Sequence, residues 1–577
     1  MKKKLLPALI VTGLIILVGI IMGITALINK YTPTKKTEDL KEYFNISSDD
    51  EAALIVDNEL SDYKAKIIDK KIYVDYKFVH DSLNSRFYWD ANENVLLYTT
   101  ASDIISAAAD SNSYSVTKQT NDFGYPIVKA TSDSALIALD YVKQYSNITF
   151  KSYDDPARVV ITSKWDEIDS ATVNKSTQVR MKGGIKSPIL KEVKKDDKIT
   201  ILDSGDKWDK VATEDGVIGY IKRKALSESK KTKLTNPDYE EENFTHIKKD
   251  KDICLAWNQV TSQSANSKVA QVISSTKGIN VMSPTWFYLN DNNGNLADIA
   301  SKDYVSYCHS QGIEVWGLFS NFENTDVDAA YVLTHTSTRT TLINQIMSAA
   351  FNYKLDDVNI DFENITEAAY GDSYTEFIRE LAIKCHNNGI SLSVDVTVPA
   401  SFNKFFNRSD MANFADYIVI MGYDEHYKGS DAGSVSSIPW VTEGVESTLK
   451  EVPADQIILG MPFYTRIWEL TPKEDDDAVT DTEDQSKYTV ASQVYSMDAA
   501  AAQLATNNAT AALDEESGQN YAEWSVSNKL YKVWLEDNTS LENRLKLVDD
   551  NKLAGAAFWK LGFENSSVWD TVIKYLN

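Results

Sequence analysis

The C-terminal half of this chain alternates two hydrophobic patterns along its length. Eight short runs there are rich in Val, Ile, Leu and aromatic residues, as strands are, and helical segments such as residues 373–387 and 541–549 separate them. The eight predicted strands are residues 253–257, 279–283, 313–319, 358–362, 392–398, 417–421, 457–462 and 556–561. Strands that alternate with helices in this way predict a closed parallel (β/α)8 barrel.

A long excursion interrupts this pattern between the last two strands, at about residues 469–537. It contains an expected β pair at residues 521–524 and 531–534, so a small inserted subdomain is predicted there. Its acidic run, residues 474–477, is expected to be a solvated loop.

Shorter patterns fill the N-terminal half. Residues 51–163 contain a weak tandem repeat, in which each copy is expected to form a strand, a short helix and two further strands. The first copy covers residues 72–76, 79–83, 87–90 and 95–99, and the second covers residues 127–130, 135–145, 148–153 and 159–162. Residues 172–227 then show four short β runs, with Gly205-Asp206 and Asp215-Gly216 at hairpin positions, which predicts a small all-β module.

The N-terminus carries an uncharged apolar run at residues 5–28, long enough to cross a bilayer. Lys2, Lys3 and Lys4 precede it, so the positive-inside rule predicts a cytoplasmic N-terminus and an extracytoplasmic remainder. A cleaved signal peptide is the alternative, but its apolar region is normally shorter and ends in a small-x-small site. An uncleaved membrane anchor is therefore preferred.

Length and charge narrow the classes of function. A chain of 577 residues is too long for one compact core, so three or four domains are expected. Its formal charge of -25 disfavours nucleic acid or an anionic surface as the main partner. Cys254, Cys308 and Cys385 fit neither a disulfide framework nor a zinc pattern, and we expect them to be small buried hydrophobes.

One predicted barrel strand departs from its neighbours in composition. Asn359, Asp361 and Glu363 share one face of residues 358–363, and apolar side chains occupy the other face. A buried parallel strand is normally apolar on both faces, and burying carboxylates is costly unless they are paired or functional. The pattern alone also fits an edge strand of an antiparallel sheet.

This run, residues 356–363, resembles the D-x-x-D-x-D-x-E signature of glycoside hydrolase family 18, the chitinase-like (β/α)8 enzymes, with Asn359 in place of the first inner Asp. Three further segments resemble family motifs in the same order: residues 417–424, 460–468 and 555–559. The resemblance covers residues 243–577. It is strongest to the spore-cortex and cell-wall branch, whose members often share Asn359 and the segment at residues 283–287.

The resemblance implies roles for three catalytic residues. Asp361 and Glu363 are separated by about 7 Å along a strand and approach a sugar from one side, so they cannot flank its C1 atom. Family 18 enzymes use the substrate's own 2-acetamido carbonyl as the nucleophile. Glu363 is then expected to be the general acid and later the base, Asp361 to accept the acetamido N–H, and Tyr423 to donate a hydrogen bond to the acetamido oxygen.

Five further residues form the expected substrate-binding set. Asp424 is expected to bind a sugar hydroxyl, and Trp559 to offer an apolar face to the pyranose ring. Trp286 and Arg466 complete the set together with Asn359. As an amide, Asn359 cannot share a proton with Asp361, and it is expected instead to donate a hydrogen bond that keeps Asp361 ionised. No metal or cofactor is implied.

Two further resemblances complete the expected domain order. Residues 50–165 resemble the repeated domain named after the N-terminus of copper amine oxidases, although copper is not implied because His80 is the only histidine in it. Residues 170–228 resemble a bacterial SH3 domain, for which a rigid spacer and a wall-binding module are both open. The expected order is a cytoplasmic stub (1–4), the anchor (5–28), a spacer (29–49), the repeat domain, the SH3-like domain, a linker (229–242) and a TIM barrel (243–577) with an α+β insertion.

The sequence therefore predicts a multidomain, membrane-tethered glycosidase with an extracytoplasmic catalytic domain. Peptidoglycan, or another N-acetylglucosamine-containing glycan, is the expected partner, and nucleic acid is not. Two alternatives stay open: a chitinase, and a surface protein that binds glycans without cleaving them. The presence of Glu363 argues against the second.

Overall fold

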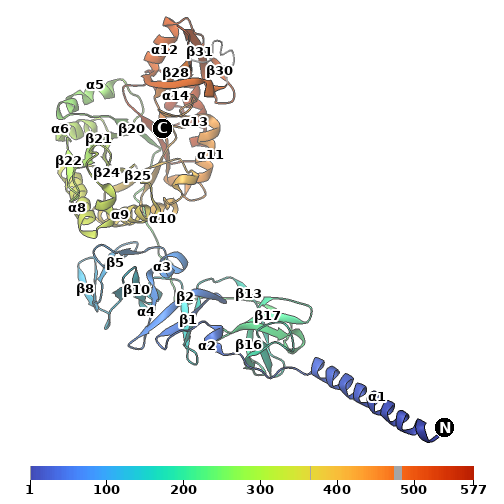
Figure 1. The fold of residues 1–577 in the computed structure, drawn as a ribbon. Coiled ribbons are helices and arrows are strands. Elements are labelled where there is room, and N and C mark those ends of the chain that lie inside the picture. The colour runs from blue at the N-terminus through green and yellow to red at the C-terminus, as the bar shows by residue number, and fades with distance from the viewer. Residues whose placement is uncertain (1, 364, 474–483, 577) are drawn as a thin grey trace. The chain divides into compact units, whose positions relative to one another are not determined.

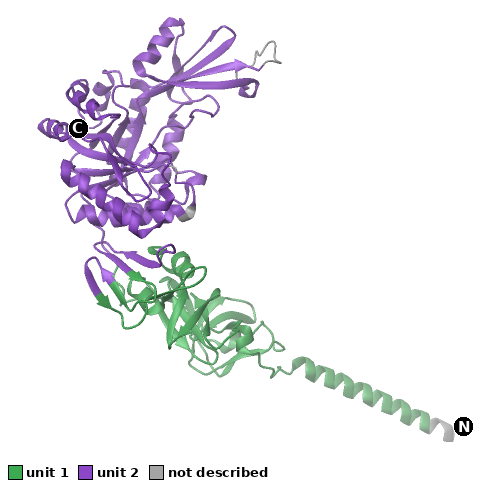
Figure 2. Ribbon diagram, turned by 60° about the vertical axis from the view of Figure 1, so that its left-hand side comes forward, with its two compact units in different colours: residues 1–89, 107–114, 121–241 green, residues 90–106, 115–120, 242–577 purple. Residues whose placement is uncertain are grey.

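The computed structural model describes residues 2–363, 365–473 and 484–576, so the acidic run at 474–477 lies outside the described residues. The chain divides into two compact units (Figure 2). One comprises residues 1–89, 107–114 and 121–241, and the other comprises residues 90–106, 115–120 and 242–577. Two short segments that the sequence assigns to the repeat domain thus group with the barrel.

The larger unit is a closed parallel barrel (Figure 1). Its strands are β20 (Ile253–Asn258), β21 (Val281–Leu289), β23 (Glu314–Ser320), β24 (Asp357–Asp361), β25 (Ser391–Thr397), β26 (Tyr417–Met421), β27 (Ile457–Pro462) and β33 (Gly555–Trp559). Each strand pairs in parallel with its neighbours, and the pairing of β20 with both β21 and β33 closes the ring. The eight-stranded barrel is confirmed, and the observed strands overlap the predicted runs.

Apolar residues on both faces of the strands create two cores. Inside the ring, large side chains such as Trp257, Trp316 and Leu318 pack against one another. Outside it, the strands pack against helices. These are α5 (Val269–Ser274), α6 (Lys302–Ser310), α7 (Ala329–Thr334), α8 (Thr336–Tyr353), α9 (Ala368–His386), α10 (Arg408–Phe414), α11 (Ile438–Thr448), α13 (Asn538–Asn551) and α14 (Val568–Val572). All three cysteines are buried with free thiols, as expected.

The excursion before the last strand is an α+β subdomain. It contains β28 (Tyr464–Pro472), β29 (Tyr488–Ser496), α12 (Met497–Thr506), β30 (Ala512–Asp514), β31 (Gln519–Val526) and β32 (Lys529–Leu535). Its strands form one sheet in the order β29-β28-β32-β31-β30, and the predicted β pair is the antiparallel pair β31–β32. The subdomain begins at Tyr464, earlier than the sequence indicates, because β28 follows β27 after a single residue.

The smaller unit contains two seven-stranded sheets. The first is antiparallel and includes β14 (Thr177–Arg180), β15 (Ile189–Val193), β16 (Lys198–Asp203), β17 (Trp208–Thr213) and β18 (Ile218–Lys222), flanked by β13 (Glu167–Thr172) and β19 (Lys230–Lys233). The predicted turns at Gly205-Asp206 and Asp215-Gly216 connect β16 to β17 and β17 to β18. This agrees with the all-β character expected for residues 172–227.

The second sheet holds part of the repeat region, in the order β11-β12-β1-β2-β3-β10-β9. Its strands are β1 (Glu51–Val56), β2 (Glu59–Ile68), β3 (Lys71–Asp75), β9 (Val128–Ala130), β10 (Ala135–Ala138), β11 (Thr149–Tyr153) and β12 (Arg158–Thr162). The expected helix at residues 135–145 is wrong over its first four residues, which form β10 between β3 and β9. Only α4 (Leu139–Gln144) is helical.

A five-stranded sheet contains the segments that group with the barrel. Its strands are β4 (Phe87–Asp90), β5 (Val95–Thr99), β6 (Ile104–Ala108), β7 (Ser113–Val116) and β8 (Gln119–Asp122). At the start of the chain, α1 (Lys2–Tyr31) contains the span Pro7–Tyr31, with a mean hydropathy of 2.7. Among the described helices it alone is long and apolar enough to cross a membrane.

Candidate active site

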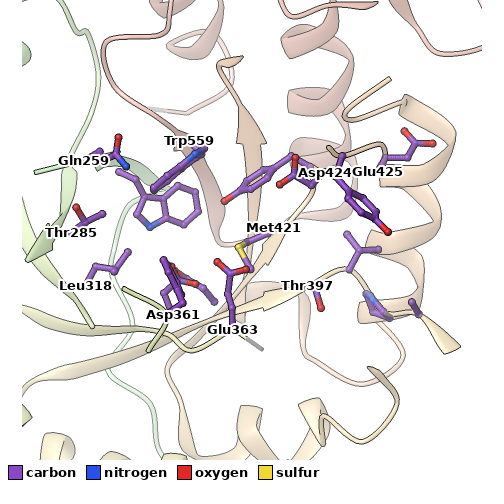
Figure 3. A pocket seen from close by; sticks show the side chains of 18 of the residues that line it. Gln259, Thr285, Leu318, Asp361, Glu363, Thr397, Met421, Asp424, Glu425 and Trp559 are labelled. Carbon is purple, nitrogen blue, oxygen red and sulfur yellow. The ribbon is translucent and has the colours of Figure 1, made fainter. Parts of the chain in front are cut away.

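A cavity of about 510 Å³ opens at the carboxyl ends of the barrel strands, where TIM barrels place their reacting groups. Five of the eight sequence-predicted site residues line it: Asp361, Glu363, Tyr423, Asp424 and Trp559. Figure 3 shows Asp361 and Glu363 pointing into the same space, with Trp559 and Asp424 around it. The structure thus brings together residues that are up to 198 positions apart in the sequence.

Glu363 lies two residues beyond the end of β24, and its backbone is held in place by Asn321. The Glu363 N–H donates to Asn321 Oδ1, and Asn321 Nδ2 donates to the Glu363 carbonyl, each at 2.9 Å. The side chain itself is exposed to the cavity. This pair of hydrogen bonds fixes the start of the side chain while leaving the carboxyl group accessible to a ligand.

The surroundings of Glu363 favour its protonated form. Partial burial, followed by the negative charges of Asp424 and Glu323, raises the pKa of Glu363. A carboxyl group that keeps its proton at higher pH is suited to protonate a leaving oxygen.

Asp361 is the last residue of β24 and is 7% exposed. Its Oδ1 atom is buried and accepts no hydrogen bond within the described part of the chain. Burial, followed by the charges of Asp395, Glu363 and Glu323, raises the pKa of Asp361 well above its ordinary value. The buried oxygen has an unused acceptor position, which an N–H group of a ligand could fill.

Asn359 lies beneath the cavity, fully buried, and every hydrogen-bonding position of its amide is used. Its oxygen accepts from Trp257 Nε1 at 3.2 Å and Ser283 Oγ at 2.9 Å. Its nitrogen donates to Ser393 Oγ at 3.1 Å and to Asp395 Oδ1 at 2.7 Å. The expectation that Asn359 donates to Asp361 is therefore wrong, because both of its N–H groups point to the neighbouring strand β25.

Among the cavity residues that were not identified from the sequence are Asp395 and Trp257. Asp395 lies on β25, where Ser391, Ser393 and Asp395 alternate with apolar residues. That is the same alternation that singled out β24, so the signal was present in the sequence. Trp257 is the penultimate residue of an entirely buried strand, β20, and resembles ordinary core there.

Aromatic rings form one side of the cavity. Trp257 meets Tyr423 and Trp559 edge to face, with ring centroids 6.5 and 6.1 Å apart. Burial, reinforced by the charges of Asp361 and Asp395, raises the pKa of Tyr423 well above its ordinary value. Tyr423 therefore keeps its hydroxyl proton and can donate a hydrogen bond to a ligand.

Asp424 follows Tyr423 in a left-handed backbone conformation, with φ of 61°. Its Oδ1 accepts a hydrogen bond from the Tyr464 hydroxyl and lies 3.9 Å from an Arg466 nitrogen. Arg466 is 9% exposed, also donates to Ser492 Oγ, and does not line the cavity. Arg466 therefore contacts a residue of the cavity, Asp424, without lining the cavity itself.

Trp286 is placed differently from the expectation. Its side chain is fully buried outside the strand ring, and its Nε1 donates to Asn266 Oδ1 at 2.8 Å. The ring packs against Tyr304 at a centroid distance of 4.9 Å. A substrate cannot reach Trp286, which is a core residue and not a binding residue.

Comparisons with known proteins agree with this geometry. Residues 320–564 match the model of Glycosyl hydrolases family 18. The chain is 22% identical over 346 residues to "Uncharacterized glycosylase YvbX" of Bacillus subtilis, covering 56% of this chain and 95% of that protein. It is 24% identical over 287 residues to "Cortical fragment-lytic enzyme" of Bacillus subtilis, covering 48% of this chain and 63% of that protein.

Among solved structures, the spore cortex-lytic enzyme SleL of Bacillus megaterium shares 19% identity with this chain, with a TM-score of 0.49 and coverage of 60% of this chain and 77% of that one. The family model and the glycosylase relatives support a glycosyl hydrolase family 18 domain at residues 320–564. The chain is thus a glycosidase.

Proposed function

We propose that this chain is a membrane-anchored, extracytoplasmic glycosidase that cleaves β-1,4 bonds at N-acetylglucosamine in peptidoglycan, with retention of configuration. One observation carries the reaction type: Asp361, at the end of β24, and Glu363, two residues beyond it, line the same cavity. Two carboxylates on the same side of a sugar cannot act as acid and nucleophile on opposite faces of C1. A nucleophile carried by the substrate, its 2-acetamido oxygen, resolves this.

In the first step, Glu363 protonates the glycosidic oxygen while the acetamido oxygen attacks C1 and forms an oxazolinium ion. The raised pKa of Glu363 supports this role, because the proton must be present at the start. In the second step, the Glu363 carboxylate takes a proton from water. The water oxygen attacks C1 from the side that the leaving group has vacated, and the bond between C1 and the acetamido oxygen breaks, which opens the oxazolinium ring. Two inversions at C1 give net retention.

Two neighbours assist the acetamido group, and two more bind the rest of the sugar. The Asp361 carboxylate accepts the acetamido N–H and faces the positive charge of the oxazolinium ion. Tyr423 donates its hydroxyl proton to the acetamido oxygen. Trp559 offers an apolar face to the pyranose ring, and Asp424 binds a hydroxyl group at the cavity rim.

The relatives of the catalytic domain and the other domains of the chain favour peptidoglycan as the substrate. Curated relatives include cortical fragment-lytic enzymes of three Bacillus species. The apolar helix α1 would hold the enzyme at the membrane, and the SH3-like and repeat modules would act as spacers or wall contacts. A chitinase is the alternative, since a di-N-acetylchitobiase of Dictyostelium discoideum and an endochitinase of Caenorhabditis elegans are also among the relatives.

The test is a digest of two substrates by the full chain in detergent. Purified peptidoglycan and chitotetraose are incubated separately, and the products are identified by mass spectrometry, with Glu363→Gln as the blank. We expect muropeptide fragments that end in N-acetylglucosamine at the reducing end. Release only of chitobiose would favour the chitinase, and binding of both glycans without products would leave a lectin.

A further inference from the structure

We propose that Asp395 is a positioning residue of this site: it receives the proton that Asp361 gives up when the acetamido group binds. The inference rests on the proposed function and adds a residue from a different strand to it. It follows from the way that β24 and β25 align their polar side chains.

The register of the two strands, extended by one residue, places Asp361 and Asp395 at neighbouring positions. Asp357 lies opposite Ser391, and Asn359 lies opposite Ser393, in a continuous parallel ladder. The next residues of the same face are Asp361 and Asp395. Partners in neighbouring strands are about 4.8 Å apart and project to the same side, so both carboxyl groups enter the cavity together. Both line it, and Asp395 is 3% exposed.

The hydrogen bonds assign the proton in the resting site. Asp395 Oδ1 accepts the 2.7 Å hydrogen bond from Asn359, a bond that favours an ionised Asp395. Asn359 is itself fixed by Trp257, Ser283 and Ser393 and cannot turn to Asp361. Asp361, by contrast, has a buried oxygen without a donor. One proton between the two groups therefore resides on Asp361.

The surrounding charges prevent both groups from ionising together. The acidic groups that face the pair are Asp357 on β24, Glu363 beyond its end, and Glu323 in the loop after β23, and the phenols are Tyr423 after β26 and Tyr374 on α9. Burial, and then the charge of Asp395, raises the pKa of Asp361, and burial with the charges of Asp357 and Glu363 raises that of Asp395. Two such carboxyl groups titrate as a pair that holds one proton over a wide pH range.

The proton transfer is balanced within the pair. When the acetamido N–H enters the site, the O–H bond of Asp361 breaks and its proton bonds to the Asp395 carboxylate. Asp361 is then an anion that accepts the N–H and faces the oxazolinium charge, and Asp395 is neutral. After hydrolysis the proton returns. The total charge of the pair stays at one negative unit throughout.

The chain offers a relocation test. Asp395→Asn removes the acceptor, and the double variant Asn359→Asp with Asp395→Asn moves the carboxyl group back to β24 while keeping one amide and one acid in contact. Ser283→Ala is the matched control, because it removes one hydrogen bond to Asn359 without changing any titratable group. All four proteins are compared as full chains in detergent, on the glycan that the wild type cleaves.

We expect Asp395→Asn to lower kcat by roughly 10²-fold, within the range of proton-transfer assistance. The acid limb of its pH profile of kcat should also move to higher pH by at least about one unit. A lone buried Asp361 takes up its proton at higher pH than the pH at which the wild-type pair takes up its second proton. The relocated variant should recover most of kcat and the original acid limb. Ser283→Ala should leave the acid limb in place.

A second measurement needs no substrate. The infrared C=O band of a protonated carboxyl group is followed against pH in the unliganded proteins, with Asp361→Asn to assign it. The last proton of the wild-type pair should leave at higher pH than that of Asp395→Asn, since the charge of Asp395 raises the pKa of Asp361. This readout stays informative if neither glycan is cleaved.

Two results would overturn the proposal. One is an acid limb and infrared titration that Asp395→Asn leaves unchanged. The other is a loss of kcat that the relocated variant does not recover, because Asp395 would then only support the fold. If the infrared titration shifts but no glycan is cleaved by the wild type, the proton-sharing pair stands and the proposed function fails.

Discussion

The chemistry of Glu363 depends on neighbours that other strands supply. Asn321, after β23, holds its backbone, and the charges of Asp424, after β26, and Glu323 favour its protonated form. None of these contacts is local in sequence. Two changes at single positions test this environment.

Glu363→Gln should abolish hydrolysis and leave glycan binding nearly intact. The amide keeps the size of the side chain but has no proton to deliver, and both steps of the reaction need this residue. We expect a loss in kcat at or above the upper part of the 10²–10⁴-fold range of acid–base assistance. Initial rates and equilibrium binding of the same glycan measure it. Glu443→Gln, an exposed position on α11, should behave as wild type; equal losses in both variants would refute the assignment.

Glu323→Gln should move the alkaline limb of kcat/KM to lower pH. The reaction starts with protonated Glu363, so activity is lost as pH rises through its raised pKa. Removing the charge of Glu323 lowers that pKa, although burial, the largest cause, keeps it elevated. A pH profile of initial rates measures the limb. A limb that stays in place would mean that Glu323 does not influence the acid.

At this scale, motif order identified the residues that line the cavity but not the network beneath them. Trp559 and Trp286 show the difference, because both are strand tryptophans in matched segments, yet one faces the cavity and the other the outer core. Which face a side chain takes depends on where its strand bends and pairs. The polar alternation of β25 marks Asp395 in the sequence, but its contact with Asn359 depends on the register between two strands.

At the scale of elements, the barrel strands were predictable because apolar runs of the right length recur between helices. The residues that cap the N-terminus of α8 could not be predicted in this way. Its N-cap position, His335, provides no side-chain hydrogen bond to the helix. Instead, Asp90 Oδ2 accepts from the Thr336 N–H at 2.7 Å, and Glu93 Oε2 accepts from the Ser337 N–H at 3.0 Å. Carboxylates from some 240 positions earlier thus satisfy the first turn of the helix.

Asp90→Ala should loosen the first turn of α8. Loss of a capping side chain costs about 1 kcal/mol, which corresponds to roughly fivefold faster amide exchange where local opening controls it. Hydrogen–deuterium exchange of the peptide that contains Thr336 and Ser337 measures this. Asn92→Ala is the matched control, since the Asn92 side chain, from the same turn, donates to the Thr334 carbonyl rather than capping an N–H of α8. Unchanged exchange in Asp90→Ala would show that the contact does not hold the helix.

At the scale of the whole molecule, composition and the N-terminal apolar run predicted several domains and one anchor. Segment boundaries were harder, because the unit that contains the barrel also includes residues 90–106 and 115–120. Sequence patterns mark where elements begin and end, whereas membership in a compact unit depends on contacts such as the hydrogen bond from Thr99 Oγ1 to Glu376 Oε1, at 2.8 Å.

Deletion of residues 5–28 should release a soluble protein. Among the described helices, no other is long and apolar enough to span a bilayer. Membranes that carry either form are washed with high salt and sedimented, and the protein is followed in both fractions. The full chain should stay with the membrane. Sedimentation of the shortened chain with the membrane would require a second attachment.

The cap of α8 also affects the order in which the chain can fold during its synthesis. The ribosome makes Asp90 and Glu93 long before Thr336 and Ser337, and at about 5–20 residues per second the delay is roughly 10–50 s. For that interval the β4–β5 turn carries two carboxylates whose partners do not yet exist. The larger unit therefore cannot be completed in the order of the chain. The β4–β5 turn must stay exposed to solvent and to proteases until the helix that it caps, α8, has been synthesised.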